Sequence, residues 1–408
     1  MKNRKLLNRS FLLIIICILI STTISGCSTG KESMNTSNRE LTMEEKLEDF
    51  EYMYNMLEES YPFFKVNERV NSVDWLGNKD KYIEKIRQTK NDEEFVEKLN
   101  EILSELNNDH TCLLSKEGYL ANYKIFYEDK NPWIKILDDN KVKDRYNFTK
   151  EDIKLLEDGV YFKNMEPAFK TDIIIPNEVA YIRLNRMDGF RVEEDEEEIL
   201  KFLKEIKNYP KLIIDIRGNG GGNPNYWEFN IVPPLIKEPL SVNYYMFARG
   251  SKYSQKFYKA RFLKLKAVSK LDEDLVKQFP KEVKSDFKYY AIFNEKIKPK
   301  NTVDFNGKIY LLVDKNVFSA AEQFASFSKE TGFATLVGEK TGGDGITENP
   351  IFFSLPNSGL VISFASVLGL NPDYTINEET KTTPDIEVNP MPHLDYEYDQ
   401  CIKTVIED

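Results

Sequence analysis

The sequence has little of the residue types that carry most metal chemistry in proteins. It contains two histidines, His110 and His393, and four cysteines among 408 residues. No His-Glu-x-x-His and no Cys-x-x-Cys spacing is present, and these spacings are typical of zinc sites. We therefore expect no metal ion and no other cofactor.

Cysteine is also too scarce for a disulfide-stabilised scaffold. Cys17 and Cys27 belong to an N-terminal targeting segment. The other two, Cys112 and Cys401, lie far apart in the chain. The sequence leaves open whether these two pair or stay free.

A concentrated basic patch is the third feature that the sequence lacks. The formal net charge is −11, from 56 Lys and Arg against 67 Asp and Glu. We therefore expect no nucleic-acid partner. The 41% hydrophobic and 12% aromatic content is that of a globular protein. The length suits two domains, or one large core plus a smaller one.

The N-terminus has no apolar run long enough for a normal membrane span, but it has the parts of a secretion signal. Basic residues precede the apolar run from Phe11 to Ile20, and Ile24-Ser25-Gly26-Cys27 resembles a bacterial lipobox. That resemblance implies a signal peptide over residues 1–26 and lipidation of Cys27. An ordinary secreted protein cut near the same place is the alternative. We expect a chain anchored by lipid to the extracytoplasmic face of the bacterial cell membrane.

We expect the next segments to be a tether, a helical domain and a connecting segment. Residues 27–42 are mostly small and polar, as in flexible linkers. Thr42 and Glu45 have the spacing of a capping box, and apolar residues recur at helical spacing through residues 43–108. Residues 109–169 are mixed and carry His110. No glycine-rich carboxylate-binding loop of a PDZ domain is evident.

Residues 170–408 predict a mixed α/β core. Apolar runs such as Val179 to Leu184 and Leu212 to Ile216 indicate strands, and Glu194 to Lys207 indicates an amphipathic helix between them. This alternation is typical of a mostly parallel sheet flanked by helices. Charged and aromatic residues over 240–300 interrupt the pattern and indicate an insertion.

A strand–turn–helix–strand unit over residues 308–346 contains the most informative serine. Ile309 to Val313 predicts a buried strand, and Ser319 stands at the start of an amphipathic helix. Serine at this position is most often a helix N-cap. The position also suits a nucleophile, because N–H groups in a first helical turn lack intrahelical partners and favour negative charge.

Three other groups are candidates for chemistry with Ser319. The run from Asp215 to Gly222 follows a strand, and its glycines suit a plain turn or an oxyanion hole. It lacks the Gly-Lys-Ser/Thr of a phosphate loop. His110 follows a helix at the domain junction and is the candidate base. The acidic pair Glu378-Glu379 either orients that histidine or lies solvated in a turn.

Together these runs resemble the C-terminal processing (tail-specific) serine peptidases. The matching runs are Asp215-Ile216-Arg217-Gly218-Asn219-Gly220-Gly221, Phe318-Ser319-Ala320-Ala321-Glu322 and Gly338-Glu339-Lys340-Thr341-Gly342-Gly343. The resemblance implies a ClpP/crotonase-like core with Ser319 as the nucleophile. It also implies an oxyanion hole formed by the N–H of Ala320 and the glycine run, with Gly221 as the first choice and Gly220 beside it.

One position departs from the family branch that uses a Ser–Lys dyad. Asp344 stands where the lysine is expected, and a carboxylate does not replace an amine of lowered pKa as the base. The tricorn-protease branch is similar at other points. Asp109-His110-Thr111 resembles its histidine motif, and Glu378 precedes Pro384-Asp385 at the matching offset. This implies His110 as the base and Glu378 as its orienting carboxylate, with Glu379 as the alternative and Asp109 in a supporting place.

The resulting prediction is a lipid-anchored, extracytoplasmic serine endopeptidase that acts on peptide or protein substrates through an acyl-enzyme. A non-catalytic ligand-binding lipoprotein is the alternative, because the retinoid-binding repeats of the vertebrate eye matrix resemble the same fold. The presence of Ser319, His110 and Glu378 at all three motif positions favours the enzyme. The sequence does not give the natural substrate or the oligomeric state.

Overall fold

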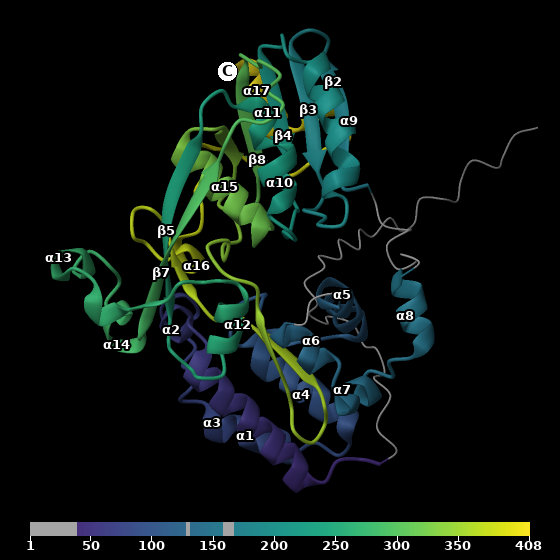
Figure 1. The fold of residues 1–408 in the computed structure, drawn as a ribbon, viewed down its shortest axis with the longest axis vertical. Helices are drawn as coiled ribbons and strands as arrows, with labels where there is room; N and C mark the ends of the chain where they lie inside the picture. Colours follow the sequence, from purple (N-terminus) through teal and green to yellow (C-terminus); the bar gives the residue numbers. More distant parts are fainter. Residues whose placement is uncertain (1–38, 128–130, 158–166) are drawn as a thin grey trace, which may run out of the picture.

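The computed structural model describes residues 39–127, 131–157 and 167–408 (Figure 1). The expected signal peptide, Cys27 and most of the expected tether lie outside these residues. Two main hydrophobic clusters divide the described chain. We call residues 167–246, 297–346 and 377–408 the sheet body, and residues 39–127, 131–157, 247–290 and 351–376 the helical body.

The sheet body is built on a six-stranded sheet with the strand order β13-β9-β8-β4-β3-β2. Neighbouring strands from β3 to β13 pair in parallel, and β2 pairs antiparallel with β3 at one edge. The strands are β2 (Phe169–Ile175), β3 (Val179–Leu184), β4 (Lys211–Asp215), β8 (Lys308–Val313), β9 (Thr335–Gly338) and β13 (Ile386–Glu387). The predicted α/β class with a mostly parallel sheet is confirmed.

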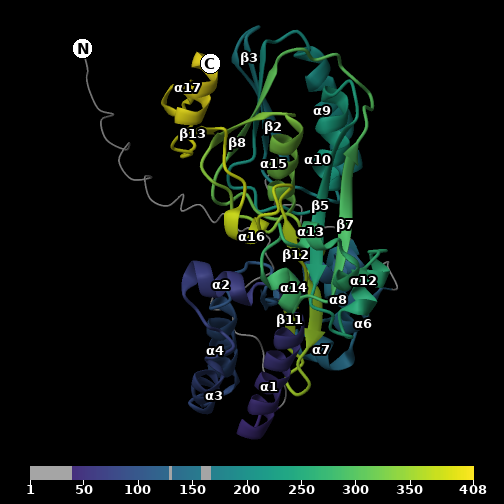
Figure 2. The same ribbon diagram turned by 90° about the vertical axis from the view of Figure 1, so that its left-hand side faces the viewer.

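Helices cover both faces of this sheet, and this explains the unbroken apolar runs of its central strands. One face packs against α9 (Val192–Glu205), α10 (Asn225–Asn230), α11 (Val232–Leu235) and α15 (Ala320–Thr331). The other face packs against α17 (Gln400–Glu407). Figure 2 shows α17 on the opposite side of the sheet from α9 and α10.

The helical body contains the helices expected for residues 43–108 and several more. The predicted capping box is present: Thr42 Oγ1 accepts a hydrogen bond from Glu45 N, and Thr42 N donates to the Glu45 carboxylate. The helices are α1 (Met43–Ser60), α2 (Phe64–Asn71), α3 (Lys79–Arg87), α4 (Asp92–Ser104), α5 (Lys116–Phe126), α6 (Pro132–Leu137), α7 (Asn140–Arg145) and α8 (Lys150–Glu157).

A hairpin from much later in the chain completes the helical body. Strand β11 (Val361–Phe364) pairs with β10 (Ile351–Ser354) on one side and with β1 (Cys112–Leu113) on the other. Their apolar side chains share one hydrophobic cluster with the N-terminal helices. Residues 43–108 therefore share a hydrophobic core with residues 351–370.

The expected insertion over residues 240–300 is a long antiparallel hairpin that joins the two bodies (Figure 1). Its strand β5 (Leu240–Ala248) begins in the cluster of the sheet body and ends in that of the helical body. The remaining elements of the insertion are α12 (Gln255–Ala260), β6 (Lys266–Ala267), η2 (Val268–Lys270), α13 (Glu273–Val276), α14 (Glu282–Asp286) and β7 (Tyr289–Ile297). Strand β12 (Leu368–Leu370), from later in the chain, pairs antiparallel with β5. The C-terminal part adds α16 (Asn377–Thr380) and η3 (Tyr396–Tyr398).

Two further findings concern the cysteines and the membrane. Cys401 is a free thiol buried in α17, so it does not pair with Cys112. No helix within residues 39–127, 131–157 and 167–408 combines the length and the hydrophobicity that crossing a bilayer requires.

The junction between α1 and the β10–β11 hairpin depends on one buried carboxylate. Asp49 accepts hydrogen bonds from the backbone N–H groups of Asn357 (2.7 Å) and Ser358 (2.8 Å). We expect Asp49→Ala to lower the free energy of unfolding by about 2–4 kcal/mol, because both buried donors lose their partner. Urea unfolding would measure this. The neighbouring Glu48→Ala removes an exposed partner of Asn357 and should change stability by less than about 0.5 kcal/mol. Equal effects of the two substitutions would contradict the assignment.

Candidate active site

Ser319 lies in the loop between β8 and α15, and its backbone conformation is unusual. Its φ is 56° and its ψ is −124°, a region that residues with a Cβ rarely adopt. Ser319 is at the N-cap position of α15, but its side chain makes no capping hydrogen bond. Instead, Ser319 Oγ lies 3.0 Å from His110 Nε2.

His110 reaches Ser319 from the helical body. It lies in the turn between α4 and β1, where Ser363 Oγ of β11 donates to its backbone carbonyl (3.0 Å). Its ring packs against Phe318, with ring centroids 4.6 Å apart. The predicted partnership of His110 and Ser319 is thus present in the geometry, although 209 positions separate the two residues.

The carboxylate that contacts His110 is Asp344, not Glu378. Asp344 Oδ2 lies 2.7 Å from His110 Nδ1. The side chain of Asn108 separates the two carboxyl groups, because its Nδ2 donates both to Asp344 Oδ2 (2.8 Å) and to Glu378 Oε1 (3.0 Å). Glu378 is therefore connected to the His110–Asp344 pair only through Asn108. This corrects the expectation that Glu378 orients His110 directly.

The other acidic candidates lie farther from the histidine. Glu379 pairs with Arg69 of α2 through two hydrogen bonds of 3.1 and 2.6 Å. Asp109 is exposed and lines the cleft beside the site. Asn108, which the sequence analysis does not single out, is the residue that connects the acidic groups. Its only sequence signal is its place two residues before His110.

The electrostatics distinguish the two carboxyl groups around Asn108. Burial, and then the negative charge of Asp344, raise the pKa of Glu378 well above its ordinary value. Glu378 Oε2 is buried without a hydrogen-bond partner. The arrangement thus disfavours the ionised form of Glu378. Among the described residues, no group of three or more His, Cys, Asp or Glu side chains is arranged to hold a metal ion.

The glycine run after β4 packs directly against Ser319. Gly221 has a φ of 102°, and a Cβ on it would lie 2.8 Å from Ser319 Cβ and 2.9 Å from Ala320 N. Only glycine fits so close an approach. The Gly221 N–H donates to Asn219 Oδ1 (2.9 Å), so this donor is already engaged. Gly220 lines the cleft, and Ala320 is the first residue of α15, where the N–H has no intrahelical partner.

A cleft of about 460 Å³ lies next to these residues, between the two bodies. Helix α2 and the loop after α4 form one wall, and the loops of the sheet body that carry Gly220, Phe318 and Glu378 form the other. Phe318 and Asp109, the sequence neighbours of Ser319 and His110, line the cleft.

A buried acid supports the first turn of α15 from behind. Glu322 is fully buried, and its Oε1 accepts hydrogen bonds from Asn377 Nδ2 (2.8 Å) and Thr382 Oγ1 (2.7 Å). Burial raises its pKa to about 7. Because Asn377 precedes Glu378 in α16, Glu322 fixes the segment that carries Glu378 relative to the helix that follows Ser319.

Comparison with known proteins gives a family and a fold. A family model described as Peptidase family S41 matches residues 178–388, just over half of the chain. No curated protein sequence gives a significant match. A solved structure of a candidate peptidase from Parabacteroides merdae ATCC 43184 is 20% identical, with a TM-score of 0.57 over 89% of this chain and 96% of that chain.

A second solved structure, mature CPAF complexed with lactacystin, is 13% identical, with a TM-score of 0.58 over 90% of this chain and 97% of that one. At these identities the likeness shows the fold. It extends over both bodies, since it covers most of the chain.

The buried carboxyl of Glu322 predicts a pH-dependent stability. Its pKa is about 7 in the folded protein, against an ordinary value of 4.5. The unfolded chain therefore releases the proton first as the pH rises, and stability falls between about pH 4.5 and 7. We expect Glu322→Gln to remove this loss, which amounts to about 3 kcal/mol at most. Unfolding at pH 5 and pH 8 tests this. A difference between the variant and the wild type that does not change with pH would contradict it.

Proposed function

The chain belongs to peptidase family S41 and is a serine-type peptidase, and we propose that it cleaves peptide bonds with a Ser319–His110–Asp344 triad. The observation that carries this proposal is the continuous chain of hydrogen bonds from Ser319 Oγ to His110 Nε2 and from His110 Nδ1 to Asp344 Oδ2. The family assignment supports the reaction, and these contacts support the proposed roles.

In this proposal His110 is the general base. With Asp344 charged, the proton of the imidazole lies on Nδ1, and Nε2 is free to take the proton of Ser319 Oγ. The oxygen then attacks the peptide carbonyl. The imidazolium formed is stabilised by Asp344 and donates its proton to the leaving amine, and water hydrolyses the acyl-enzyme by the same route.

The negative oxygen of the tetrahedral intermediate needs two donors close to Ser319. We assign these to the N–H groups of Ala320 and Gly220. Gly221, the first choice from the sequence, instead allows the close packing of the glycine run against Ser319 and has its N–H bound to Asn219.

Asp344 also explains how the protein works without the dyad lysine. It stands at the lysine's place in the sequence motif and supplies a partner for the histidine. Glu378, held neutral by burial, shares the Asn108 amide with Asp344 and thereby limits the motion of Asp344. The alternative of a non-catalytic ligand-binding lipoprotein is not favoured, because Ser319, His110 and Asp344 form one continuous chain of hydrogen bonds.

We also propose that the protein is anchored outside the cytoplasm through a lipid on Cys27. The support is the basic N-terminus, the apolar run and the lipobox-like sequence Ile24-Ser25-Gly26-Cys27. Metabolic labelling with a radioactive fatty acid should mark the wild-type protein and not Cys27→Ser. Equal labelling of both proteins would reject the anchor.

The first prediction for the chemistry concerns the nucleophile. We expect Ser319→Ala to abolish hydrolysis of an unfolded protein such as casein and labelling by a fluorophosphonate probe, because the attacking oxygen is lost. The thermal unfolding midpoint should change little. Ser328→Ala, which removes a buried hydroxyl from the same helix, is the control and should keep both activities. Turnover by purified Ser319→Ala protein would reject the proposal.

The second prediction separates the two carboxyl groups. We expect Asp344→Asn to lower kcat by about 100-fold or more, because an amide no longer fixes the tautomer of His110. Glu378→Gln should lower kcat by less than about tenfold, because a neutral amide replaces a neutral carboxyl. Steady-state kinetics of the two variants would measure both effects. A larger loss for Glu378→Gln than for Asp344→Asn would restore the assignment made from the sequence.

A further inference from the structure

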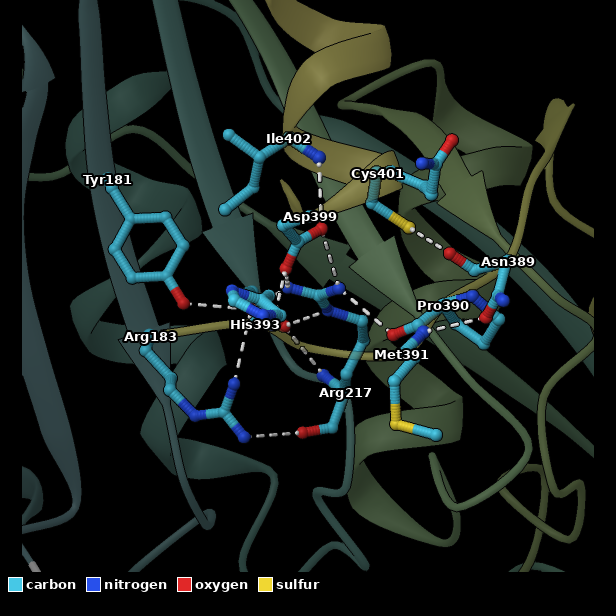
Figure 3. Close-up of polar contacts among 12 residues, drawn as sticks. Tyr181, Arg183, Arg217, Asn389, Pro390, Met391, His393, Asp399, Cys401 and Ile402 are labelled. Atoms are coloured by element: carbon cyan, nitrogen blue, oxygen red, sulfur yellow. Dashed lines mark hydrogen bonds and ion pairs between the residues drawn. The ribbon is translucent and has the colours of Figure 1, made fainter. Parts of the chain in front are cut away.

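Arg217, at the start of the glycine run, is a buried cation whose hydrogen bonds are complete. Its Nε and Nη2 donate to the two oxygens of Asp215 (3.0 and 2.6 Å). Its Nη1 and Nη2 donate to the two oxygens of Asp399 (3.1 and 2.9 Å), and Nη1 also donates to the carbonyl of Pro390 (2.9 Å). All five N–H groups of the guanidinium are therefore used, as Figure 3 shows for its contacts with Asp399 and Pro390.

The charges around Arg217 are closely matched. Burial acts to raise the pKa of Asp215, but the hydrogen bonds and charge of Arg217 outweigh it, and the pKa lies below its ordinary value. Asp215 Oδ2 also accepts from Tyr181 Oη (2.8 Å) and Arg183 Nη1 (3.2 Å). Two carboxylates thus face two guanidinium groups, which is the condition under which buried charges are tolerated.

Asp399 brings the C-terminal helix into this network. It is the N-cap of α17, and its Oδ1 accepts from Ile402 N (3.2 Å). The other end of α17 is held separately, because Lys211 Nζ donates to the carbonyls of Val405 (2.9 Å) and Ile406 (3.0 Å). Lys211 and Asp215 are the two ends of β4, so each end of the helix is fixed to one end of the same strand.

The network continues into the loop that supplies the proposed oxyanion donor. Arg183 Nη2 donates to the carbonyl of Arg217 (3.0 Å), and Gly218 N donates to Asp314 Oδ1 (2.9 Å). The backbone carbonyl of Asn219 accepts a hydrogen bond from the N–H of Phe318 (3.2 Å). The residues on both sides of Gly220 are thus fixed to the sheet and to the segment that carries Ser319.

We propose that Asp399 is a positioning residue for the oxyanion hole: it orients Arg217, and Arg217 fixes the backbone of Gly218 to Gly221 against Ser319. This inference rests on the proposed peptidase function. Its physical basis is that two of the five donors of a buried guanidinium lose a charged acceptor when Asp399 is neutral. The guanidinium then shifts, and an oxyanion donor displaced by a fraction of an ångström stabilises the transition state less.

The test is Asp399→Asn, with Lys211→Met as the matched control. Asparagine is as good an N-cap as aspartate, so the substitution keeps α17 capped through Oδ1. It removes the charge that faces Arg217 and replaces Oδ2, which accepts from Arg217 Nη2 and His393 N, with an NH2 donor. We expect kcat to fall about 10- to 100-fold while KM stays within about twofold. Lys211→Met removes the hydrogen bonds to the C-terminal end of α17. It should therefore lower the thermal unfolding midpoint while kcat stays at the wild-type value. Asp399→Glu, which keeps the charge, should recover part of kcat.

Hydrogen exchange gives a second readout that does not require turnover. Amides of residues 217–222 should exchange faster in Asp399→Asn than in the wild type, and at the wild-type rate in Lys211→Met. Unchanged kcat and exchange in Asp399→Asn, or equal losses in both variants, would overturn the inference.

A wild-type protein without hydrolysis would instead reject the proposed function, and the exchange comparison would still decide the role of Asp399. If Asp399→Asn does not fold, Asp399→Ser, which also suits an N-cap and carries no charge, is compared with the control, and wild-type kcat and exchange in it would overturn the inference.

Discussion

The hydrogen bond between His110 Nδ1 and Asp344 Oδ2 is the interaction on which the arrangement of the site depends. It joins the helical body to the sheet body and leaves the other imidazole nitrogen facing Ser319. A buried carboxylate needs strong donors, and Asn108 supplies the second one. Glu378 shares that amide, and burial together with the nearby Asp344 raises its pKa. The distribution of charge in the site thus follows from Asp344.

Sequence patterns were sufficient for features that depend on local structure. The apolar runs predict the parallel sheet, and the strand–turn–helix pattern predicts where Ser319 lies. The family resemblance adds His110. The partner of His110 was missed because the two residues lie 234 positions apart in the chain. In addition, Asp344 replaces the lysine expected in the motif, and in the sequence alone this replacement indicates a lost catalytic group. Burial decides which carboxyl group is charged, and burial depends on the tertiary structure.

The two sides of the site are held in different ways. On the sheet side, Arg217 and its two aspartates form a fully paired network behind the glycine run. This network was not predictable from the motif alone, because Asp399 lies 182 positions after Arg217. On the helical side, His110 is held through its backbone by Ser363 of the hairpin and through its ring by Phe318. Ser319, the proposed nucleophile, thus belongs to the side with the buried ion-pair network, and His110, the proposed base, belongs to the other side.

The division of the site between the two bodies has a consequence for how the protein becomes active. The segment that matches the family, residues 178–388, contains Ser319 and Asp344 but not His110. The working unit is therefore larger than the segment by which the family is identified. During synthesis the base emerges long before the nucleophile, and β11, which holds the base, emerges later still. A growing chain consequently carries no assembled site under the proposed mechanism, because Ser319, His110 and Asp344 meet only once both bodies have folded and docked.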